Sequence, residues 1–302
     1  MLATNQINTA NNLEVIAPKP GNIGAEIRGL DVKALASGAA EFKTILETIY
    51  RHKLVVIRGQ DLGSQEYVDF TRKLGTPQIY FQDNYHHPKH PEIFVSSNVN
   101  KPGEKIGVKG TGRYWHTDCA FEKKPLSLTS IKPVVLPNSA RETYYIDMHQ
   151  VYKKLPEDLT AIVENATAQH EGQMRYKVQA CDIDKSLREL LDWINDEVPP
   201  VQHPAIIQHP VTGDKILYIN SGFTTKIVGY NYEENQKIMQ ALFDFIEREE
   251  HIHTHRWQEG DVIIWDNRYL NHKACTVPPG EKSKSYRIGI YDDYPFYVGL
   301  EK

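Results

Sequence analysis

Trp115-His116-Thr117-Asp118 is the stretch around which the chain is organised. In an extended segment, side chains two residues apart point to the same face, so an imidazole and a carboxylate project side by side. His272 follows far downstream, after the run Trp265-Asp266-Asn267-Arg268, and is the candidate for a third ligand. Two histidines and one carboxylate leave open positions on a metal and are typical of non-haem Fe(II) oxygenases. We therefore predict an Fe(II) site made of His116, Asp118 and His272.

Arg287 lies shortly beyond His272 in the alternating run from Ser285 to Ile290. A guanidinium can hold a carboxylate through two parallel hydrogen bonds. Arg287 is therefore the predicted anchor for a 2-oxo acid that chelates the metal and leaves one position for O2. Thr143 is the candidate hydroxyl beside this anchor. Arg141 is either a second contact to the co-substrate or a surface charge at the start of a strand.

Asp118 also bears on the class of reaction. A small residue in its place would open a position for a halide ion. The carboxylate instead favours hydrogen abstraction followed by hydroxylation or by desaturation-type chemistry.

Other histidines and cysteines offer competing ligand sets. His253 and His255 alternate on a predicted strand, but no carboxylate accompanies them at a suitable spacing. The same holds for the neighbouring pair His86-His87 and for His251. Cys119 and Cys275 lie beside the predicted ligands, where each is either a thiolate ligand or a small buried residue.

Composition sets the class of protein. The chain has 302 residues, of which 40% are hydrophobic and 25% charged, with a net charge of -4. The chain contains no long block of lysine and arginine, so the sequence does not predict nucleic-acid binding. No apolar run approaches the ~18 residues of a membrane span, and the N-terminus lacks the pattern of a signal peptide. Three scattered cysteines indicate a reducing compartment, so we expect a cytoplasmic protein that does not bind a membrane and leave a homo-oligomer open.

Many short strands with a few inserted helices predict a mostly β protein with a double-sheet jelly roll, also called a double-stranded β-helix. We expect residues 1–12 to be disordered and residues 13–302 to form one domain. The predicted strands lie within 13–30 and at 53–58, 92–96, 126–135, 142–147, 166–170, 215–220 and 286–292, with a hairpin of 253–257 and 262–265. The predicted helices lie at 39–52, 64–74, within 148–165, at 186–195 and at 231–250.

Local signals refine these elements. Ser64 is the predicted cap of the second helix, and Asn231 with Glu234 forms a capping box on the last. Leu187, Leu190, Leu191 and Ile194 form one apolar stripe on the helix at 186–195. Residues 78–91, rich in aromatic and polar side chains, are either a surface loop or a loop that faces the substrate. Residues 98–112 are predicted to form a mobile lid.

The His-x-Asp segment, the run from Trp265 to Arg268, His272 and Arg287 together resemble the taurine dioxygenase family of Fe(II)/2-oxoglutarate oxygenases. The resemblance covers about Leu13 to Tyr297. It implies a double-stranded β-helix core that binds Fe(2+), 2-oxoglutarate and O2. It also implies His116, Asp118 and His272 as iron ligands, with Arg287 and Thr143 contacting 2-oxoglutarate.

Further segments are similar to one subgroup, the isonitrile-forming oxygenases of lipopeptide biosynthesis. They are Tyr85-His86-His87-Pro88, 90–97, 143–147, Lys177 and 224–227. This likeness implies a fatty-acid-derived substrate, an N-carboxymethyl-3-amino fatty acid that loses CO2 and becomes an isonitrile. It also implies that Lys177 holds a substrate carboxylate, with Tyr80 and Tyr85 near the same end and Phe121 lining the pocket.

Two positions depart from the subgroup. Phe81 stands where a second tyrosine is usual, and Gln179 stands where an arginine is expected. Losing that cation weakens one carboxylate contact. The alternatives are a hydroxylase of a small sulfonate, carboxylate or amino acid in the same superfamily, and a jelly-roll binding protein without the chemistry.

Overall fold

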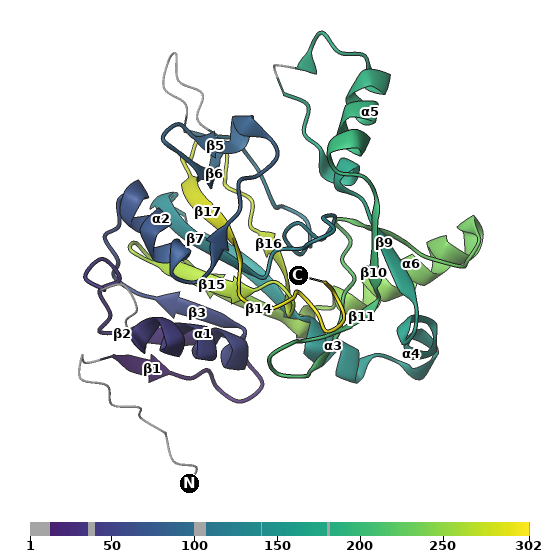
Figure 1. Ribbon diagram of the computed structural model, residues 1–302, viewed down its shortest axis with the longest axis horizontal. Helices are drawn as coiled ribbons and strands as arrows, with labels where there is room; N and C mark the ends of the chain where they lie inside the picture. Colours follow the sequence, from purple (N-terminus) through teal and green to yellow (C-terminus); the bar gives the residue numbers. More distant parts are fainter. Residues whose placement is uncertain (1–12, 36–39, 100–106, 140, 180–181, 302) are drawn as a thin grey trace.

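The computed structural model describes residues 13–35, 40–99, 107–139, 141–179 and 182–301 (Figure 1). Within this part of the chain the largest element is a nine-stranded sheet of order β1-β2-β3-β15-β7-β17-β6-β5, with β4 beside β17. Its pairs are antiparallel except β2 with β3. The strands are β1 (Glu14–Ile16), β2 (Ala25–Arg28), β3 (Leu54–Ile57), β4 (Thr76–Pro77), β5 (His86–His87), β6 (His90–Ser97), β7 (Leu128–Val135), β15 (Val262–Asp266) and β17 (Lys284–Tyr291).

A second antiparallel sheet has the order β14-β8-β16 and faces the first across a pocket. Its strands are β14 (Ile252–Arg256), β8 (Glu142–Asp147) and β16 (Leu270–Ala274). Two further small sheets, β10-β9-β13 and β11-β12, lie between β8 and β14 in the sequence. Their strands are β9 (Thr167–His170), β10 (Val201–Pro204), β11 (Ile206–Gln208), β12 (Lys215–Leu217) and β13 (Thr224–Ile227). The molecule is mostly β, as predicted.

The central strand β15 shows why the sequence folds this way. It pairs with β3 on one side and β7 on the other, and all five of its residues are buried. A strand covered on both faces reads as a continuous apolar run rather than an alternating one. Ile263 and Trp265 belong to the core toward the pocket, whereas Val262 and Ile264 belong to the core under the N-terminal helices.

Helices cover the sheets at two ends of the molecule (Figure 1). The first two, α1 (Ala40–His52) and α2 (Ser64–Arg72), pack against strands of the large sheet. The others belong to the part of the chain between β8 and β14. They are α3 (Met148–Lys154), α4 (Glu157–Val163), α5 (Leu187–Glu197) and α6 (Tyr232–Ile246), with the 3-10 turns η2 (Gly172–Arg175) and η4 (Glu249–His251). A further 3-10 turn, η1 (Asp83–Tyr85), lies earlier in the chain, between β4 and β5. No helix in the described ranges is both long and apolar enough to span a bilayer.

The caps decide where the helices begin. The predicted capping box of Asn231 and Glu234 is present on α6, and Ser186 with Glu189 forms another on α5. The predicted cap of α2 is wrong: Gly63 is the N-cap and makes no side-chain bond, and Ser64 is already helical. The helix predicted to reach residue 250 ends at Ile246, and the chain continues as a 3-10 turn.

The predicted hairpin of 253–257 and 262–265 is also wrong. β14 pairs with β8, whereas β15 pairs with β3 and β7, so the chain crosses from one sheet to the other. Asp261 fixes the crossing, because its carboxylate accepts the Gln258 amide at 2.8 Å and binds Arg58 at 2.7 Å. A turn signal between two apolar runs does not tell whether the runs pair with each other.

Several other predictions change in detail. The stripe on α5 divides: Leu190 and Ile194 are buried, but Leu187 and Leu191 are exposed. The segment 78–91 contains η1, β5 and the start of β6 rather than a continuous loop. Residues 1–12, for which disorder was expected, and 100–106 of the expected lid lie outside the described residues.

Candidate active site

The chain pairs His116 with His272 through the backbone. The His116 amide donates to the His272 carbonyl at 3.0 Å, and the His272 amide donates back at 2.8 Å. Next to this bridge, the Thr117 hydroxyl donates to the Asn271 side chain at 2.8 Å, and Asn271 donates to the Ile219 carbonyl at 2.9 Å. Two segments far apart in the sequence are therefore tied together at β16.

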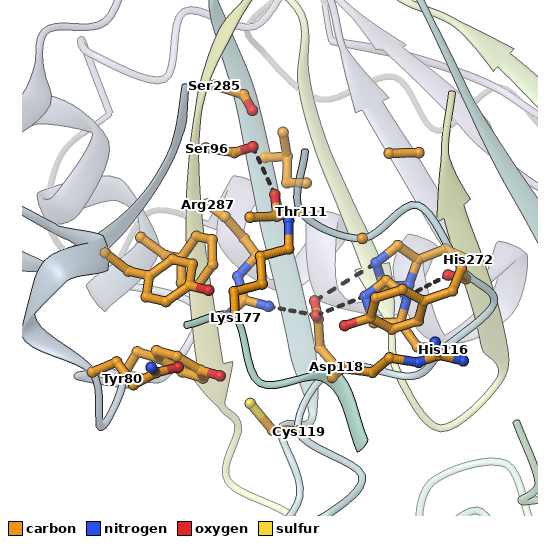
Figure 2. A pocket seen from close by; sticks show the side chains of 18 of the residues that line it. Tyr80, Ser96, Thr111, His116, Asp118, Cys119, Lys177, His272, Ser285 and Arg287 are labelled. Atoms are coloured by element: carbon orange, nitrogen blue, oxygen red, sulfur yellow. Dashed lines mark hydrogen bonds and ion pairs between the residues drawn. The ribbon is translucent and has the colours of Figure 1, made fainter. Parts of the chain in front are cut away.

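The structure brings His116, Asp118 and His272 into one group, with ligand atoms within 4.8 Å of one another (Figure 2). The His116 Nε2 is 3.5 Å from Asp118 Oδ1, and the His272 Nε2 is 3.9 Å from Asp118 Oδ2. The His116 Nδ1 lies 2.9 Å from the Tyr114 carbonyl, which fixes the ring so that Nε2 faces the site. All three side chains are buried. Two imidazoles and a carboxylate in this arrangement fit a ferrous ion.

The protonation states suit a metal. Burial alone would raise the pKa of Asp118, but Arg287, His272 and His116 hold it well below its usual range. Burial, together with the neighbouring His116, lowers the pKa of His272 well below its usual range. The carboxylate is therefore ionised and the His272 ring neutral, which are the forms that bind metal.

A chain of buried hydrogen bonds connects the Trp265 indole to the Asp118 carboxylate. The Trp265 indole donates to Asn267 Oδ1, Asn267 Nδ2 donates to Thr129 Oγ1, and Thr129 Oγ1 donates to Asp118 Oδ2, each at 2.8 Å. Sequence reasoning singled out the run from Trp265 to Arg268 but gave it no such role, and it missed Thr129. No signal in the sequence separates Thr129 from the other threonines of the strands.

Asp266 and Arg268, the other two residues of that run, stabilise the fold. Asp266 binds His209 at 2.9 Å, and Arg268 binds Asp292 at 2.8 Å and the Phe296 carbonyl at 2.8 Å. Both Asp266 and Arg268 are fully buried and lie outside the pocket lining. Arg268 fastens the C-terminal segment beside β15, and Asp266 fastens the turn that follows β11.

Arg287 reaches the metal group from β17. Its guanidinium donates to Asp118 Oδ1 and lies 4.3 Å from the ring centre of Phe94 and 5.8 Å from that of Tyr80. Figure 2 shows it on the side of Asp118 opposite the two histidines. Its Nε has no partner within the described residues. The side chain is 13% exposed, so it faces the pocket and not the solvent.

Arg141 and Thr143 form a separate polar group. Arg141 donates to the Ser283 hydroxyl at 2.8 Å and to the Ser285 hydroxyl at 3.2 Å. Thr143 accepts the Trp257 indole at 2.9 Å. Both line the pocket, so Arg141 is not a surface charge.

The residues predicted to hold the substrate also line the pocket: Tyr80, Tyr85, Lys177 and Phe121. Lys177 donates to the carbonyls of Lys109 and Gly110, the first at 2.8 Å. Phe81 also lines the pocket. Gln179 does not, because its side chain donates to the Lys177 carbonyl at 2.8 Å within its own loop.

The competing ligand sets are not assembled. Among the residues the structure describes, no second group of three metal-binding side chains occurs. His255 lies 3.3 Å from Asp261, outside the pocket, and Cys119 faces Gln78 at 3.5 Å. Cys275 makes a hydrogen bond with the Glu142 amide.

The sequence did not predict that the pocket lining is mainly cationic. Of its described lining residues, Asp118 is the single carboxylate, whereas four are cationic: Arg141, Arg175, Lys177 and Arg287. From the sequence, Arg175 was expected to bind an anion, together with Lys177, only in the hydroxylase alternative. Its guanidinium lies 4.4 Å from the ring centre of Tyr114 and binds the Ser221 and Gly222 carbonyls at 3.0 and 3.2 Å.

Comparison with known proteins agrees with this geometry. A model of the taurine catabolism dioxygenase TauD, TfdA family matches residues 15–288. The chain is 30% identical over 262 residues to an alpha-ketoglutarate-dependent sulfate ester dioxygenase from Pseudomonas putida, covering 86% of this chain and 83% of that protein. It is 26% identical over 280 residues to an alpha-ketoglutarate-dependent 2,4-dichlorophenoxyacetate dioxygenase from Cupriavidus pinatubonensis, covering 89% of this chain and 94% of that protein.

The fold is shared with solved structures as well. A taurine dioxygenase from Burkholderia xenovorans superposes with a TM-score of 0.74 at 24% identity, covering 96% of this chain and 94% of that one. The prediction of an oxygenase using Fe(II), 2-oxoglutarate and O2 is confirmed, and the alternative of a binding protein without chemistry is wrong. The chain belongs to the TauD/TfdA family of non-haem Fe(II)- and 2-oxoglutarate-dependent dioxygenases.

Proposed function

We propose that this enzyme converts an N-carboxymethyl-3-amino fatty acid into an isonitrile, with Fe(II) held by His116, Asp118 and His272. The observation that carries the proposal is the cationic excess of the pocket: four cationic side chains against one carboxylate. Arg175 is exposed, but Arg141, Lys177 and Arg287 are partly buried, and buried charges need partners of opposite sign. After the dianion 2-oxoglutarate is placed, cations remain for a substrate with more than one anionic group. An N-carboxymethyl amino acid carries two carboxylates.

The polar groups divide between the two ligands. We assign the far carboxylate of 2-oxoglutarate to Arg141 and Thr143. Arg141 is held by two serine hydroxyls and keeps a charge that no carboxylate among the described residues neutralises. The sequence-based assignment gave this role to Arg287. We assign Arg287, Tyr80 and Tyr85 to one substrate carboxylate, because the guanidinium lies over Tyr80 and Phe94.

Lys177 is assigned to the second substrate carboxylate. Within the described ranges, its ammonium group binds carbonyl oxygens and no acid. Burial, with Arg113 and Lys109 nearby, lowers the pKa of Lys177, so an anion beside it would relieve the repulsion. The two sheets would form the double-stranded β-helix, as one domain over residues 13–302.

The reaction balances over two rounds. Each round turns 2-oxoglutarate and O2 into succinate and CO2 and removes two hydrogens from the substrate as water. The N–H, both hydrogens of the N-methylene and the carboxyl proton leave, the C–C bond to the carboxyl breaks, and CO2 departs. When bound, Fe(II) supplies the activation of O2. Arg287 and Lys177 keep the N-methylene in place between the rounds, and the aromatic lining excludes water.

The test is turnover of the iron-loaded enzyme with 2-oxoglutarate, air and an N-carboxymethyl-3-aminoalkanoate. We expect a tetrazine-reactive product and two succinates for each isonitrile. His272→Ala should abolish both products. Succinate formed without isonitrile would refute the proposal.

A second candidate is hydroxylation of a small sulfonate, carboxylate or amino acid. It is favoured by the likeness to proteins named for a sulfate ester and a phenoxyacetate, each with one anionic group. In that case Arg287 alone would hold the anion. A panel of such acids, assayed for succinate and for the hydroxylated or cleaved product, separates the two candidates.

A further inference from the structure

We propose that Trp257 and Ser285 are positioning residues for the co-substrate, which together leave two hydroxyl hydrogens free to bind its far carboxylate. This inference rests on the proposed function, which assigns the far carboxylate of 2-oxoglutarate to Arg141 and Thr143. It adds the residues that orient this end of the pocket and the reason why a 2-oxo acid without a second carboxylate is rejected.

Trp257 is attached to both of the residues assigned to the far carboxylate. Its backbone amide donates to the Arg141 carbonyl at 3.0 Å, and its indole Nε1 donates to Thr143 Oγ1 at 2.9 Å. The centre of its ring lies 5.9 Å from the Arg141 guanidinium, within reach of a cation–π interaction. Trp257 and Thr143 are both buried, and both line the pocket. One side chain therefore holds two separate groups of the site.

The indole also decides how the Thr143 hydroxyl is used. An indole N–H can only donate, so Thr143 Oγ1 is the acceptor in this hydrogen bond. A hydroxyl has a single hydrogen, and no acceptor among the described residues takes it. The Thr143 hydrogen is therefore left for a ligand in the pocket.

Ser285 is oriented in the same way on the sheet that faces Thr143 across the pocket. Arginine can only donate, so Ser285 Oγ accepts Arg141 Nη2 at 3.2 Å and keeps its own hydrogen for another partner. Ser283 also accepts from Arg141, at 2.8 Å, but it lies outside the described lining, whereas Ser285 lines the pocket. Figure 2 shows Ser285 at the end of the pocket away from Cys119.

This end of the pocket therefore offers hydrogen-bond donors and a positive charge. Asp118, the single carboxylate of the described lining, is bound to Arg287. A carboxylate accepts hydrogen bonds and has no hydrogen to give, so it matches the donors of Thr143, Ser285 and Arg141. An alkyl end would leave these donors without partners, and a site built to bind a polar group strongly rejects the analogue that lacks it.

The register of the second sheet places these donors at a distance from the metal ligands. His272 on β16 is paired with Tyr145 on β8, and Ala274 is paired with Thr143. Two residues of a strand span about 7 Å, which separates the level of Thr143 from that of His272. The methylene groups of 2-oxoglutarate separate its keto acid end from its far carboxylate, so its two ends can bind at these two levels.

The test is binding without turnover. Enzyme loaded with Mn(II), under argon, is titrated with 2-oxoglutarate and with 2-oxopentanoate, which has the same chain length and no second carboxylate. Trp257→Phe keeps a ring and removes the indole donor. It should weaken the binding of 2-oxoglutarate about 3- to 10-fold and leave that of 2-oxopentanoate unchanged, so the ratio of the two dissociation constants falls. An unchanged ratio, whether both affinities fall together or neither does, would overturn the proposal.

A double-mutant cycle measured with 2-oxoglutarate alone shows whether Trp257 acts through Thr143. Thr143→Val removes the hydroxyl and should weaken binding about 10- to 100-fold, the loss expected for a hydrogen bond to a charged group. Thr143→Ser keeps the hydroxyl and should retain most of the affinity. In the Thr143→Val background, Trp257→Phe should cause no further loss. A further loss as large as that in the unaltered enzyme would refute the role of Trp257.

Ser285→Ala and Ser283→Ala form a matched pair that leaves the tryptophan in place. Each removes one acceptor of Arg141, but Ser285→Ala also removes a donor from the pocket. Ser285→Ala should therefore weaken 2-oxoglutarate more than Ser283→Ala does, although the bond to Ser283 is the shorter one. The opposite order would show that the serines only tether Arg141, which contradicts the proposal. Trp193→Phe, on α5 and outside the described lining, is the control for losing an indole and should leave binding unchanged.

The two proposals fail separately. The expected changes in binding, with no isonitrile formed by the unaltered enzyme, would leave the positioning roles standing and refute the reaction. Isonitrile formation, with unchanged binding of 2-oxoglutarate to Trp257→Phe and Ser285→Ala, would do the reverse.

Discussion

A single hydroxyl helps to orient the carboxylate of Asp118, the predicted metal ligand. Thr129 is fully buried and joins Asn267 to Asp118 by two hydrogen bonds of 2.8 Å. Thr129→Val keeps the shape and removes both bonds. We expect metal affinity to fall about 10- to 100-fold, as when other partners that orient metal ligands are lost. Calorimetric titration with Mn(II) measures this without turnover.

Thr129→Ser is the control, because it keeps the hydroxyl and should restore most of the affinity. Thr129→Val also leaves the Asn267 amide without its acceptor, which costs about 1–3 kcal/mol of unfolding free energy. Unchanged Mn(II) affinity in a folded Thr129→Val protein would show that the chain of hydrogen bonds only supports the fold.

Arg141 and Arg287, two of the three arginines that line the pocket, give a second test at this scale. Arg141→Met removes the donor proposed for the far carboxylate of 2-oxoglutarate. The KM for 2-oxoglutarate should rise about 10- to 100-fold, which corresponds to a lost hydrogen bond between charged groups. Arg287→Met should instead raise the KM of the primary substrate. The reverse pattern, with 2-oxoglutarate affected by Arg287, would restore the assignment made from sequence.

How far the sequence predicts the site can be seen from these residues. His116, Asp118 and His272 were predictable because few residue types bind iron and their order along the chain is specific. Thr129 was not, because a threonine in a strand is ordinary whichever side chain it faces. The roles of Arg141 and Arg287 were not separable either, because they depend on which strands face each other across the pocket.

At the scale of elements, the turn between β12 and β13 packs against the segment that carries His116. Gly222 is packed so closely that a Cβ atom there would lie 2.8 Å from the Trp115 carbonyl oxygen and 2.9 Å from the His116 Cβ. Gly222→Ala should therefore push His116 out of place. We expect a loss of about 1–3 kcal/mol of unfolding free energy from overpacking, together with weaker Mn(II) binding.

Gly63→Ala is the control for this change, because its Cβ would meet only the movable carboxylate of Glu66. Urea unfolding and Mn(II) titration of both variants give the comparison. If Gly222→Ala binds Mn(II) as tightly as the unaltered protein, the turn can retreat and the contact does not position His116.

The bounds of elements that depend on neighbouring residues in the sequence were predicted well. The pairing of strands, which depends on distant parts of the chain, was not. α6 begins where its capping box places it. The crossing between β14 and β15 was misread as a hairpin, because the turn at residues 258–261 is local whereas its pairing partners, β8 and β3, lie far away in the sequence. The short β10, β11 and β13 were missed, since each finds its partner within a small separate sheet.

For the whole molecule, the strongest pH dependence of stability should come from histidines that fold into the core uncharged. His170 on β9 is 0% exposed, and its Nδ1 lies 3.2 Å from the Thr224 hydroxyl. Burial, and then the nearby His203, lowers the pKa of His170 from 6.5 to about 3. Between these two values the unfolded chain binds a proton at this position and the folded protein does not. Stability from this group is therefore fully present above the unfolded pKa and is lost as the pH falls toward 3.

Removing the His170 ring should therefore weaken the dependence of stability on pH. His170→Asn keeps an acceptor for Thr224 and removes the titrating group. In metal-free protein, the slope of unfolding free energy against pH below about pH 6.5 should decrease by roughly 1.4 kcal/mol per pH unit, the contribution of one proton. Urea unfolding over a series of buffers measures the slope. His90→Asn, at a half-buried histidine, should leave it nearly unchanged. An unaltered slope in His170→Asn would mean that His170 takes up its proton in the folded protein as readily as in the unfolded chain, so that the buried ring is reached by water.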